Sequence, residues 1–164
     1  MLYTLILYGF QQQIRFNTNH GFNNPPGSRW FNECLLSKFI TFARCSRTKN
    51  IEYCNMSFDK LIEKITPDTL VYADPPYRST LGVYNDGKRG FEGWTINHEH
   101  NLCMFLDKIN ERGSRFMLSY VLKVNDFYNK EIATWAANNN YNVIDIEIPQ
   151  GRYNNRKEVL ITNY

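Results

Sequence analysis

The sequence predicts an α/β fold with parallel strands that ends in a hairpin. In residues 56–164, amphipathic helical patterns alternate with short apolar strands, and this order builds parallel sheets. The strand at 69–73 runs directly into Asp74, and ligands of such sheets sit at the carboxyl ends of strands. Residues 1–55 show no clean alternation, so we treat them as a separate segment.

Turn residues and basic-aromatic stretches dominate the first segment. The Gly-Phe-Asn-Asn-Pro-Pro-Gly cluster at 21–27 predicts a turn, and an arginine stands beside aromatic residues at 15–17 and at 29–31. Apolar residues at helical spacing then predict a helix over 31–42. The opening run, 1–8, predicts a buried helix or strand, because it lacks the basic start of a signal peptide.

The second segment contains the elements of the predicted sheet. Apolar residues that recur every three to four positions predict helices over 56–65, 98–112 and 126–138. Short apolar runs between turn signals predict strands over 69–73, 115–119, 143–148 and 159–162. Pro67 stops the first of these helices, and Gly113 lies just past the end of the second.

The charge of the chain is unevenly distributed. The 164 residues carry a net charge of only +3, and their length suits one domain with a real core. Residues 1–50, however, carry six basic side chains and one acid, whereas the remaining 114 residues carry 13 basic and 15 acidic side chains. This local excess suits a face that contacts phosphate groups, and a merely solvated surface would have the same composition.

The four cysteines indicate neither a metal site nor a disulfide framework. Cys34, Cys45, Cys54 and Cys103 have no C-x-x-C spacing and no accompanying histidine cluster. We therefore expect free thiols in a reducing cytosol. No apolar run is long enough to span a membrane, so we expect a cytoplasmic protein without a membrane partner.

Asp74-Pro75-Pro76-Tyr77 combines an acid, a rigid turn and an aromatic ring at the end of a strand. Each proline fixes φ and removes an N–H donor, so the carbonyls of Asp74 and Pro75 can point outward at a fixed angle. A carboxylate and a rigid carbonyl are two acceptors for the N–H bonds of an exocyclic amine, and a tyrosine can stack on the base that carries it. A rigid strand exit with an N-capping aspartate is the structural alternative, and the tetrapeptide alone leaves both open.

The chain resembles the D12 class of DNA adenine methyltransferases, the Dam-like family, over essentially its whole length. The residues that carry the resemblance are Asp74-Pro75-Pro76-Tyr77, Asn85, Gly93-Trp94-Thr95, His98, Phe116, Leu118, Ser119 and the ending Glu158-Val-Leu-Ile-Thr-Asn-Tyr164. Upstream, residues 8–17, 21–23 and 25–27 resemble the family's target-recognition segment. The resemblance implies a partial Rossmann-like methyltransferase sheet in 56–164, the catalytic portion. It also implies an amino-terminal helical and hairpin target-recognition segment in 1–55.

The resemblance also implies roles for individual residues. Asp74, Pro75, Pro76 and Tyr77 would form the catalytic pocket that grips and stacks an adenine flipped out of double-stranded DNA. Asp74 would also lie near the methionine part of S-adenosyl-L-methionine, the methyl donor. Ser57 and Phe58 occupy the position beside the cofactor's adenine, although Phe58 fits equally well as a core aromatic on the predicted 56–65 helix.

The DNA-binding residues follow from the same resemblance. Arg15 falls where the family has a base-reading arginine, and an arginine can make a bidentate contact to guanine. Gln11, Asn17 and Arg29 accompany it in the expected recognition segment. The resemblance places the enzyme among the site-specific, adenine-specific DNA methyltransferases of restriction-modification or phage systems.

One departure from the family concerns the cofactor site. The family carries an F-x-G-x-G loop after its first strand, where the absence of side chains lets the backbone approach the cofactor. No G-x-G occurs in this sequence. We therefore expect a carboxyl-terminal portion of the enzyme that binds the cofactor weakly and is inactive without a complementing amino-terminal fragment.

Other functions remain as alternatives. A protein-glutamine or RNA-directed methyltransferase usually carries asparagine in place of Asp74, so the aspartate and the upstream Arg15-Phe16-Asn17 block favour DNA. A non-catalytic DNA-binding remnant would keep the basic first segment without turnover. For His98 and His100, at the start of a predicted helix, capping or solvent contact is expected instead of catalysis.

Overall fold

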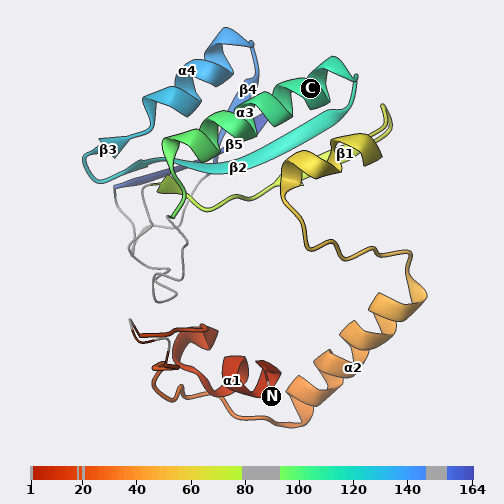
Figure 1. The fold of residues 1–164 in the computed structure, drawn as a ribbon, viewed down its shortest axis with the longest axis vertical. Coiled ribbons are helices and arrows are strands. Elements are labelled where there is room, and N and C mark those ends of the chain that lie inside the picture. The colour runs from red at the N-terminus through yellow and green to blue at the C-terminus, as the bar shows by residue number, and fades with distance from the viewer. Residues whose placement is uncertain (1, 18, 20, 79–92, 147–154) are drawn as a thin grey trace. The chain divides into compact units, whose positions relative to one another are not determined.

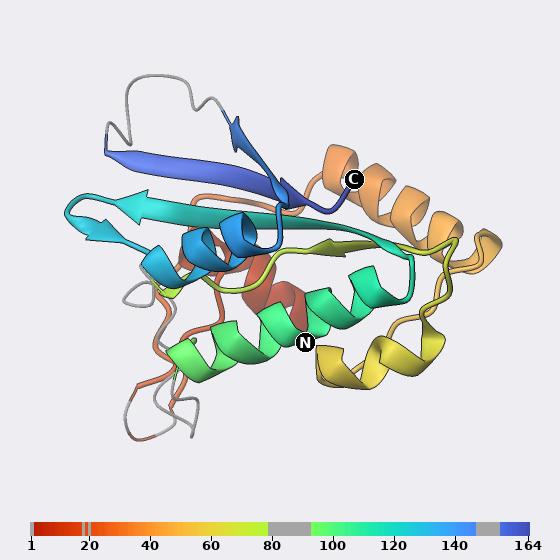
Figure 2. The ribbon, with the colours of Figure 1, turned by 90° about the horizontal axis from the view of Figure 1, so that it is seen from above.

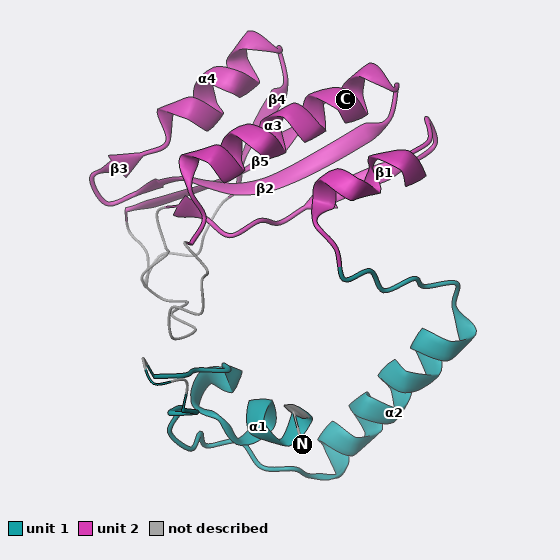
Figure 3. Cartoon of the chain, in the orientation of Figure 1, with its two compact units in different colours: residues 1–55, 84–91 teal, residues 56–83, 92–164 magenta. Residues whose placement is uncertain are grey.

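The computed structural model describes residues 2–17, 19, 21–78, 93–146 and 155–164, and the described chain divides into two compact units (Figure 3). Unit 1 contains the described residues from 2 to 55. Unit 2 contains those from 56 to 164. The part of the chain that is described holds no helix long and apolar enough to cross a membrane.

Unit 2 is built on one mixed sheet (Figure 1). Its strands in the described residues are β1 (Leu70–Ala73), β2 (Arg115–Val124), β3 (Phe127–Tyr128), β4 (Asn142–Ile146) and β5 (Arg156–Thr162). They lie in the order β1-β2-β5-β4, and β3 pairs with the far end of β2. The predicted α/β class is therefore confirmed.

The pairing of these strands corrects the prediction of a parallel sheet. β1 pairs parallel with β2, whereas β5 pairs antiparallel with both β2 and β4. The strands joined through helices, β1, β2 and β4, thus run in one direction, as their alternation with helices predicts. The β4–β5 hairpin is also confirmed. Its second strand inserts between β2 and β4, and this placement is not visible in the local sequence pattern.

Two helices cover one face of the sheet (Figure 2). α3 (Ile96–Glu111) and α4 (Lys130–Asn138) supply apolar side chains at three- and four-residue spacing. These pack on the alternating side chains of β2 and β5 that point to the same face. The most deeply buried members of this core are Leu106, Ile109, Phe116, Leu118, Ile132, Ala136, Val159 and Ile161.

The ends of α3 show why this helix begins and ends where it does. Thr95 caps the amino terminus, because its hydroxyl accepts from the backbone N–H of His98 while His98 Nδ1 lies 3.1 Å from the backbone nitrogen of Thr95. The expected capping role of His98 is confirmed. At the other end Gly113 has φ +72°, a left-handed conformation that glycine adopts without a steric penalty.

Several predicted boundaries differ from the observed ones. Residues 58–64 form η2, a 3₁₀ helix (Phe58–Lys64), where we predicted an α-helix over 56–65. α4 begins only at Lys130, because residues 127–128 pair with β2 as β3. β2 continues to Val124, five residues beyond its predicted end.

Unit 1 begins with short elements joined by close backbone contacts and continues into one longer helix. Its helices are α1 (Leu2–Tyr8), the 3₁₀ turn η1 (Phe10–Gln12) and α2 (Glu33–Thr48). The 21–27 cluster folds back onto the end of α1, since Gly27 N–H donates to the Tyr8 carbonyl at 2.7 Å. A Cβ atom at Gly27 would lie 2.7 Å from the carbonyl oxygen of Gly9. This close approach requires glycine.

Burial in unit 1 differs from what we predicted for residues 1–8. The run forms a helix, but Tyr3, Leu5 and Tyr8 are exposed and only Leu7 is buried among its described side chains. α2 begins where Asn32 accepts from the N–H of Leu35, and it extends to Thr48 instead of residue 42. Among the cysteines, Cys34 and Cys54 are exposed and Cys45 and Cys103 are half-buried.

Removal of one buried side chain from α3 should destabilise unit 2. Ile109 is fully buried in the core, whereas Ile96 on the same helix is 47% exposed. We expect Ile109→Ala to lower the free energy of unfolding by about 3 kcal/mol, because a cavity remains where the side chain was. Ile96→Ala should change it by about 0.5 kcal/mol or less. Urea denaturation of the two variants would measure the difference, and equal losses would contradict the assigned burial.

Candidate active site at the end of β1

Asp74 leaves the sheet at the carboxyl end of β1. Ala73, the last residue of this strand, pairs with Leu118 of β2, so the next residues emerge beside Ser119 and Tyr120. The carboxylate of Asp74 is exposed to solvent, whereas Ala73 packs against the core. The apolar strand thus ends in a charged side chain at the rim of the sheet, as the sequence pattern predicts.

Tyr77 turns back onto Asp74. Its hydroxyl donates to Asp74 Oδ1 at 2.7 Å, and its ring contacts the ring of Tyr120 edge-on with centroids 5.5 Å apart. The guanidinium of Arg156 lies over the Tyr77 ring, 5.8 Å from its centroid. Partial burial and the hydrogen bond to Asp74 raise the pKa of Tyr77 to about 12, so the phenol stays protonated at neutral pH. The turn therefore holds the carboxylate and the aromatic ring in one fixed arrangement.

A cavity of about 480 Å³ opens beside the Asp74 segment. Its apolar wall includes Phe58, Val71, Trp94 and Phe105, and its rim includes Asp74, Pro75 and Pro76. Asp74 therefore both lines this cavity and accepts a hydrogen bond from Tyr77. An apolar pocket with one carboxylate at its edge suits a ligand that has a flat apolar part and a positively charged group.

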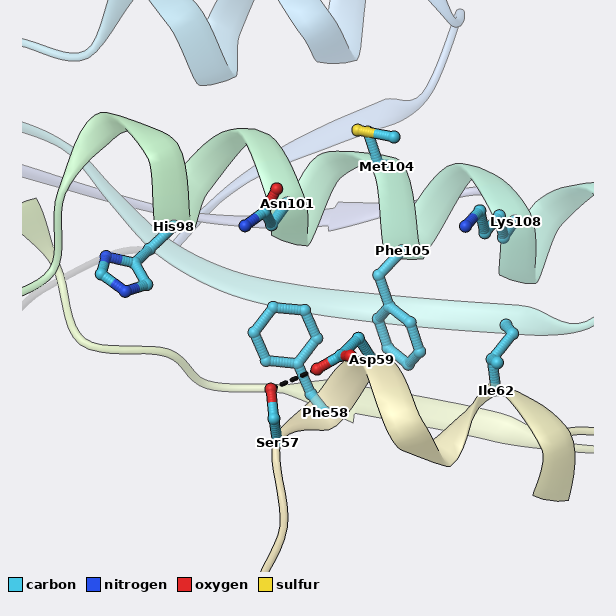
Figure 4. A pocket seen from close by; sticks show the side chains of 9 residues that line it. All are labelled: Ser57, Phe58, Asp59, Ile62, His98, Asn101, Met104, Phe105 and Lys108. Atoms are coloured by element: carbon cyan, nitrogen blue, oxygen red, sulfur yellow. Dashed lines mark hydrogen bonds between the residues drawn. The ribbon is translucent and has the colours of Figure 1, made fainter.

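A smaller groove of about 360 Å³ lies between η2 and α3 (Figure 4). Figure 4 shows the Phe58 and Phe105 rings next to each other, with Ser57 at one edge. Their ring centroids are 5.3 Å apart. Ser57 donates to the carboxylate of Asp59, and His98 and Lys108 project from α3 toward the groove. Ser57 thus lies on the groove, not among the residues that line the larger cavity.

Phe58 was predicted either to lie beside the cofactor or to be a core aromatic, and its position is compatible with both roles. The ring packs against the core of unit 2, with Trp94 and Phe105 as aromatic neighbours. It also lines the larger cavity and the groove. A core aromatic can therefore present part of its surface to a ligand. Its placement on a 3₁₀ helix instead of an α-helix does not remove it from either contact.

The four residues predicted to bind DNA all lie in unit 1 and all are exposed. Arg15 stands at the start of a loop that closes at Asn23, because the Arg15 carbonyl accepts from the N–H of Asn23 at 3.1 Å. Asn17 shapes this loop, because its Oδ1 accepts from the N–H groups of Asn19 and Gly21. Gln11 has φ +54°, and Arg29 precedes Trp30, which is 73% exposed.

Residues 1–153 match the family described as D12 class N6 adenine-specific DNA methyltransferase. The chain belongs to this family. Because the match starts at the first residue, it includes both unit 1 and the Asp74–Tyr77 segment. The predicted resemblance is confirmed.

Relatives of this D12 chain include three modification enzymes. It is 36% identical over 170 residues to the type II methyltransferase M.FokI of Planomicrobium okeanokoites. It is 37% identical over 166 residues to the modification methylase LlaI of Lactococcus lactis, and 35% over 172 residues to the modification methylase StsI of Streptococcus sanguinis. Each alignment covers 99% of this chain and 26% of the relative. The chain thus spans about a quarter of the length of these relatives.

Two residues that lie close to the Asp74–Tyr77 segment were not identified from the sequence. Glu99 is 1% exposed and Tyr120 is 1% exposed, and the Tyr120 hydroxyl donates to the Glu99 carboxylate. The spacing of apolar residues around each of them could have predicted their burial. Glu99 lies three residues before Leu102 and seven before Leu106, on the apolar face of its helix, and Tyr120 continues the alternation of Phe116 and Leu118. Asn85, part of the resemblance, lies outside the described residues.

The raised pKa of Tyr77 predicts a loss of stability at alkaline pH. The phenol has an ordinary pKa of 10 and one of about 12 in the folded chain. Its stabilising contribution is therefore complete below pH 10 and is lost as pH rises from 10 to 12. We expect the free energy of unfolding, measured with urea from pH 8 to 11, to fall less steeply for Tyr77→Phe than for the unsubstituted chain. Tyr72→Phe, at a 62% exposed tyrosine of β1, is the control. An unchanged slope for Tyr77→Phe would contradict the assigned environment.

Proposed function

We propose that this chain forms the adenine pocket and the DNA-reading surface of a site-specific DNA methyltransferase. The enzyme would move a methyl group from S-adenosyl-L-methionine to the exocyclic amine of an adenine flipped out of duplex DNA. The observation that carries the proposal is that Asp74, in a chain of the D12 family, lines an apolar cavity and accepts a hydrogen bond from Tyr77. The modification-enzyme relatives support a restriction-modification role.

Asp74 and Pro75 would activate the amine. The lone pair of an exocyclic amine is delocalised into the base, so this nitrogen is a poor nucleophile. A carboxylate and a rigid carbonyl that accept from its two N–H bonds favour a pyramidal nitrogen with a localised lone pair. Asp74 is exposed at the rim of the sheet, and Pro75 and Pro76 follow it with fixed φ angles. Asp74 is thus available to a base that approaches from solvent, and the Pro75 carbonyl would complete the pair.

Tyr77 would stack on the flipped base. Base flipping is needed because the amine of a paired adenine is inaccessible inside the duplex. The Tyr77 ring is held by Asp74 and Tyr120, so little freedom is lost when a base stacks on it. Its elevated pKa keeps the ring neutral, which avoids placing a negative charge beside the reacting amine.

The larger cavity would hold part of the methyl donor. Phe58 and Trp94 offer apolar aromatic surface for the adenine ring of S-adenosyl-L-methionine, and the Asp74 carboxylate can bind its ammonium group. Ser57, on the neighbouring groove, lies on the chain next to Phe58. The bound donor supplies a methyl group on a cationic sulfur, which becomes neutral when the carbon joins the amine nitrogen and a proton is released. The sequence has no G-x-G turn to complete such a site.

Unit 1 would read the DNA as the target-recognition segment, and unit 2 would be the catalytic portion. The loop of residues 15–23 presents Arg15 at its base, and an arginine is the side chain best suited to a bidentate contact with guanine. Arg29 and the exposed Trp30 offer a charge and an aromatic surface nearby in sequence. Gln11 and Asn17 would assist, Asn17 by fixing the loop. The excess of basic residues in 1–50 supports contact with phosphates.

Substitution of Asp74 tests the catalytic proposal. We expect Asp74→Ala to lower methyl transfer to duplex DNA by about 100-fold or more, because one of the two acceptors is removed. DNA affinity should stay within about twofold, since the proposed contacts to the sequence and the phosphates lie in unit 1 and Asp74 contacts only the flipped base of the DNA. Transfer of a radiolabelled methyl group and a fluorescence-anisotropy titration would measure the two effects. Asp68→Asn, at an exposed aspartate before β1, is the matched control.

The transfer assay should be run with the chain alone and with a separately supplied Gly-rich amino-terminal segment of a relative. Turnover that appears only with the added segment supports a complementing fragment. DNA binding without turnover in either arm supports the alternative, a non-catalytic DNA-binding remnant. Retained turnover in Asp74→Ala would reject the proposed mechanism.

Arg15 should control sequence preference. We expect Arg15→Ala to reduce the enrichment of the preferred sequence from a random duplex pool by about tenfold, because a bidentate arginine–guanine contact contributes about 1–3 kcal/mol of discrimination. Lys38→Ala, at an exposed lysine of α2, should weaken binding to all sequences equally. Sequencing of the bound fraction measures both. An unchanged preference in Arg15→Ala would exclude this residue as a base reader.

A further inference from the structure

A carboxylate lies inside the apolar core of unit 2. Glu99 of α3 is 1% exposed, and its environment must compensate for the loss of water around a charge. The Tyr120 hydroxyl and Asn129 Nδ2 both donate to Glu99 Oε1, the latter at 2.7 Å. On the other side Arg78 Nε lies 3.4 Å from Glu99 Oε2. Helix α3, strand β2, the start of α4 and the residue after Tyr77 therefore meet at one carboxylate.

Two of these contacts lead directly to the Asp74–Tyr77 segment. Arg78 follows Tyr77 in the chain, so its ion pair with Glu99 restrains the residue next to the stacking ring. The Tyr120 hydroxyl also forms a hydrogen bond with the backbone of Arg78. In addition, the Tyr120 ring contacts the Tyr77 ring edge-on. Glu99 is thus linked to the Asp74–Tyr77 segment in two ways: directly through the Arg78 side chain, and through Tyr120 to the Arg78 backbone.

The remaining contacts tie this centre to α4. Asn129 is fully buried and caps α4, because its Oδ1 accepts from the N–H of Ile132 while its Nδ2 donates to Glu99. Arg78 pairs with Glu131 in the first turn of the same helix at 2.8 Å. Its guanidinium also lies over the Phe127 ring, 5.3 Å from the centroid. Arg78 is therefore held by three contacts.

We propose that Glu99 is a positioning residue for the methyl-transfer site. Its negative charge anchors Arg78, and its acceptor oxygen orients Tyr120, so together they set the direction of the Tyr77 ring and of the Asp74 carboxylate bound to it. This inference rests on the proposed function, but the anchoring itself is measurable without turnover. A neutral side chain at this position would keep the shape of the core and lose the attraction for Arg78.

The first test measures the environment of Tyr77. Protein labelled with 3-fluorotyrosine gives fluorine resonances for its 11 tyrosines, and Tyr77→Phe assigns that of Tyr77. We expect Glu99→Gln and Tyr120→Phe to shift the Tyr77 resonance. The matched control is Asp107→Asn, a half-buried carboxylate on the same helix that accepts from Trp135 Nε1 and from the Tyr141 hydroxyl. It should shift Tyr141 and leave Tyr77 in place.

A second pair of variants keeps the inference testable if Glu99→Gln does not fold. Arg78 is 21% exposed, so its replacement disturbs the core less. Arg78→Gln should shift the Tyr77 resonance, and Arg78→Lys, which retains the charge, should restore it in part. A Tyr77 resonance that is unchanged in folded Glu99→Gln, or in Arg78→Gln, overturns the proposal.

Kinetics separate this proposal from the proposed function. In an active preparation, we expect Glu99→Gln to lower kcat by about 100-fold, the effect of a misplacement of about 1 Å, while KM for DNA stays within about twofold. Asp107→Asn should leave both constants unchanged. An equal loss in the two variants, or a loss confined to KM, would contradict a positioning role. If the unsubstituted chain transfers no methyl group in any arm, the proposed function fails and the Tyr77 resonance decides the anchoring alone.

Discussion

Backbone pairing between β1 and β2 fixes where the Asp74–Tyr77 segment leaves the sheet. The parallel register sets Ala73 beside Leu118, so the segment emerges over Ser119 and Tyr120. Tyr77 can then pack on Tyr120 and return its hydroxyl to Asp74. A shift by one residue would turn each side chain of β1 to the opposite face of the sheet, since side chains alternate along a strand. The cavity wall and the carboxylate at its rim both depend on this register.

The buried centre around Glu99 adds order at the same place and contributes little net stability. A charge that leaves water loses several kcal/mol of solvation, and its ion pair and hydrogen bonds roughly offset that loss. What the centre provides is uniqueness, because a strand, two helices and Arg78 meet there in a single arrangement. A wholly apolar core would hold the same elements with weaker constraints on their relative rotation.

Local patterns predicted the features that depend on neighbours in the chain. β1, β2, α3 and α4 follow from apolar periodicity, and the strand-end position of Asp74 follows from the run before it. The insertion of β5 between β2 and β4 depends on pairing across long sequence separations, which no local period encodes. Residues 58–64 span only about two turns, and over that length a 3₁₀ helix and an α-helix place apolar residues alike. Glu99 resembles any solvated glutamate of a helix until the residues around it are known.

The strand order has a consequence for synthesis on the ribosome. β5 follows β1, β2 and β4 in the chain but lies between β2 and β4 in the sheet. While the chain emerges, β2 therefore displays an unsatisfied edge that carries apolar side chains, and β4 lacks the strand with which it pairs in the finished sheet. The core also remains incomplete in this interval, because the fully buried Val159 and Ile161 belong to this last strand. Until β5 pairs with both strands, their edges and the apolar core side chains remain open to association with other chains.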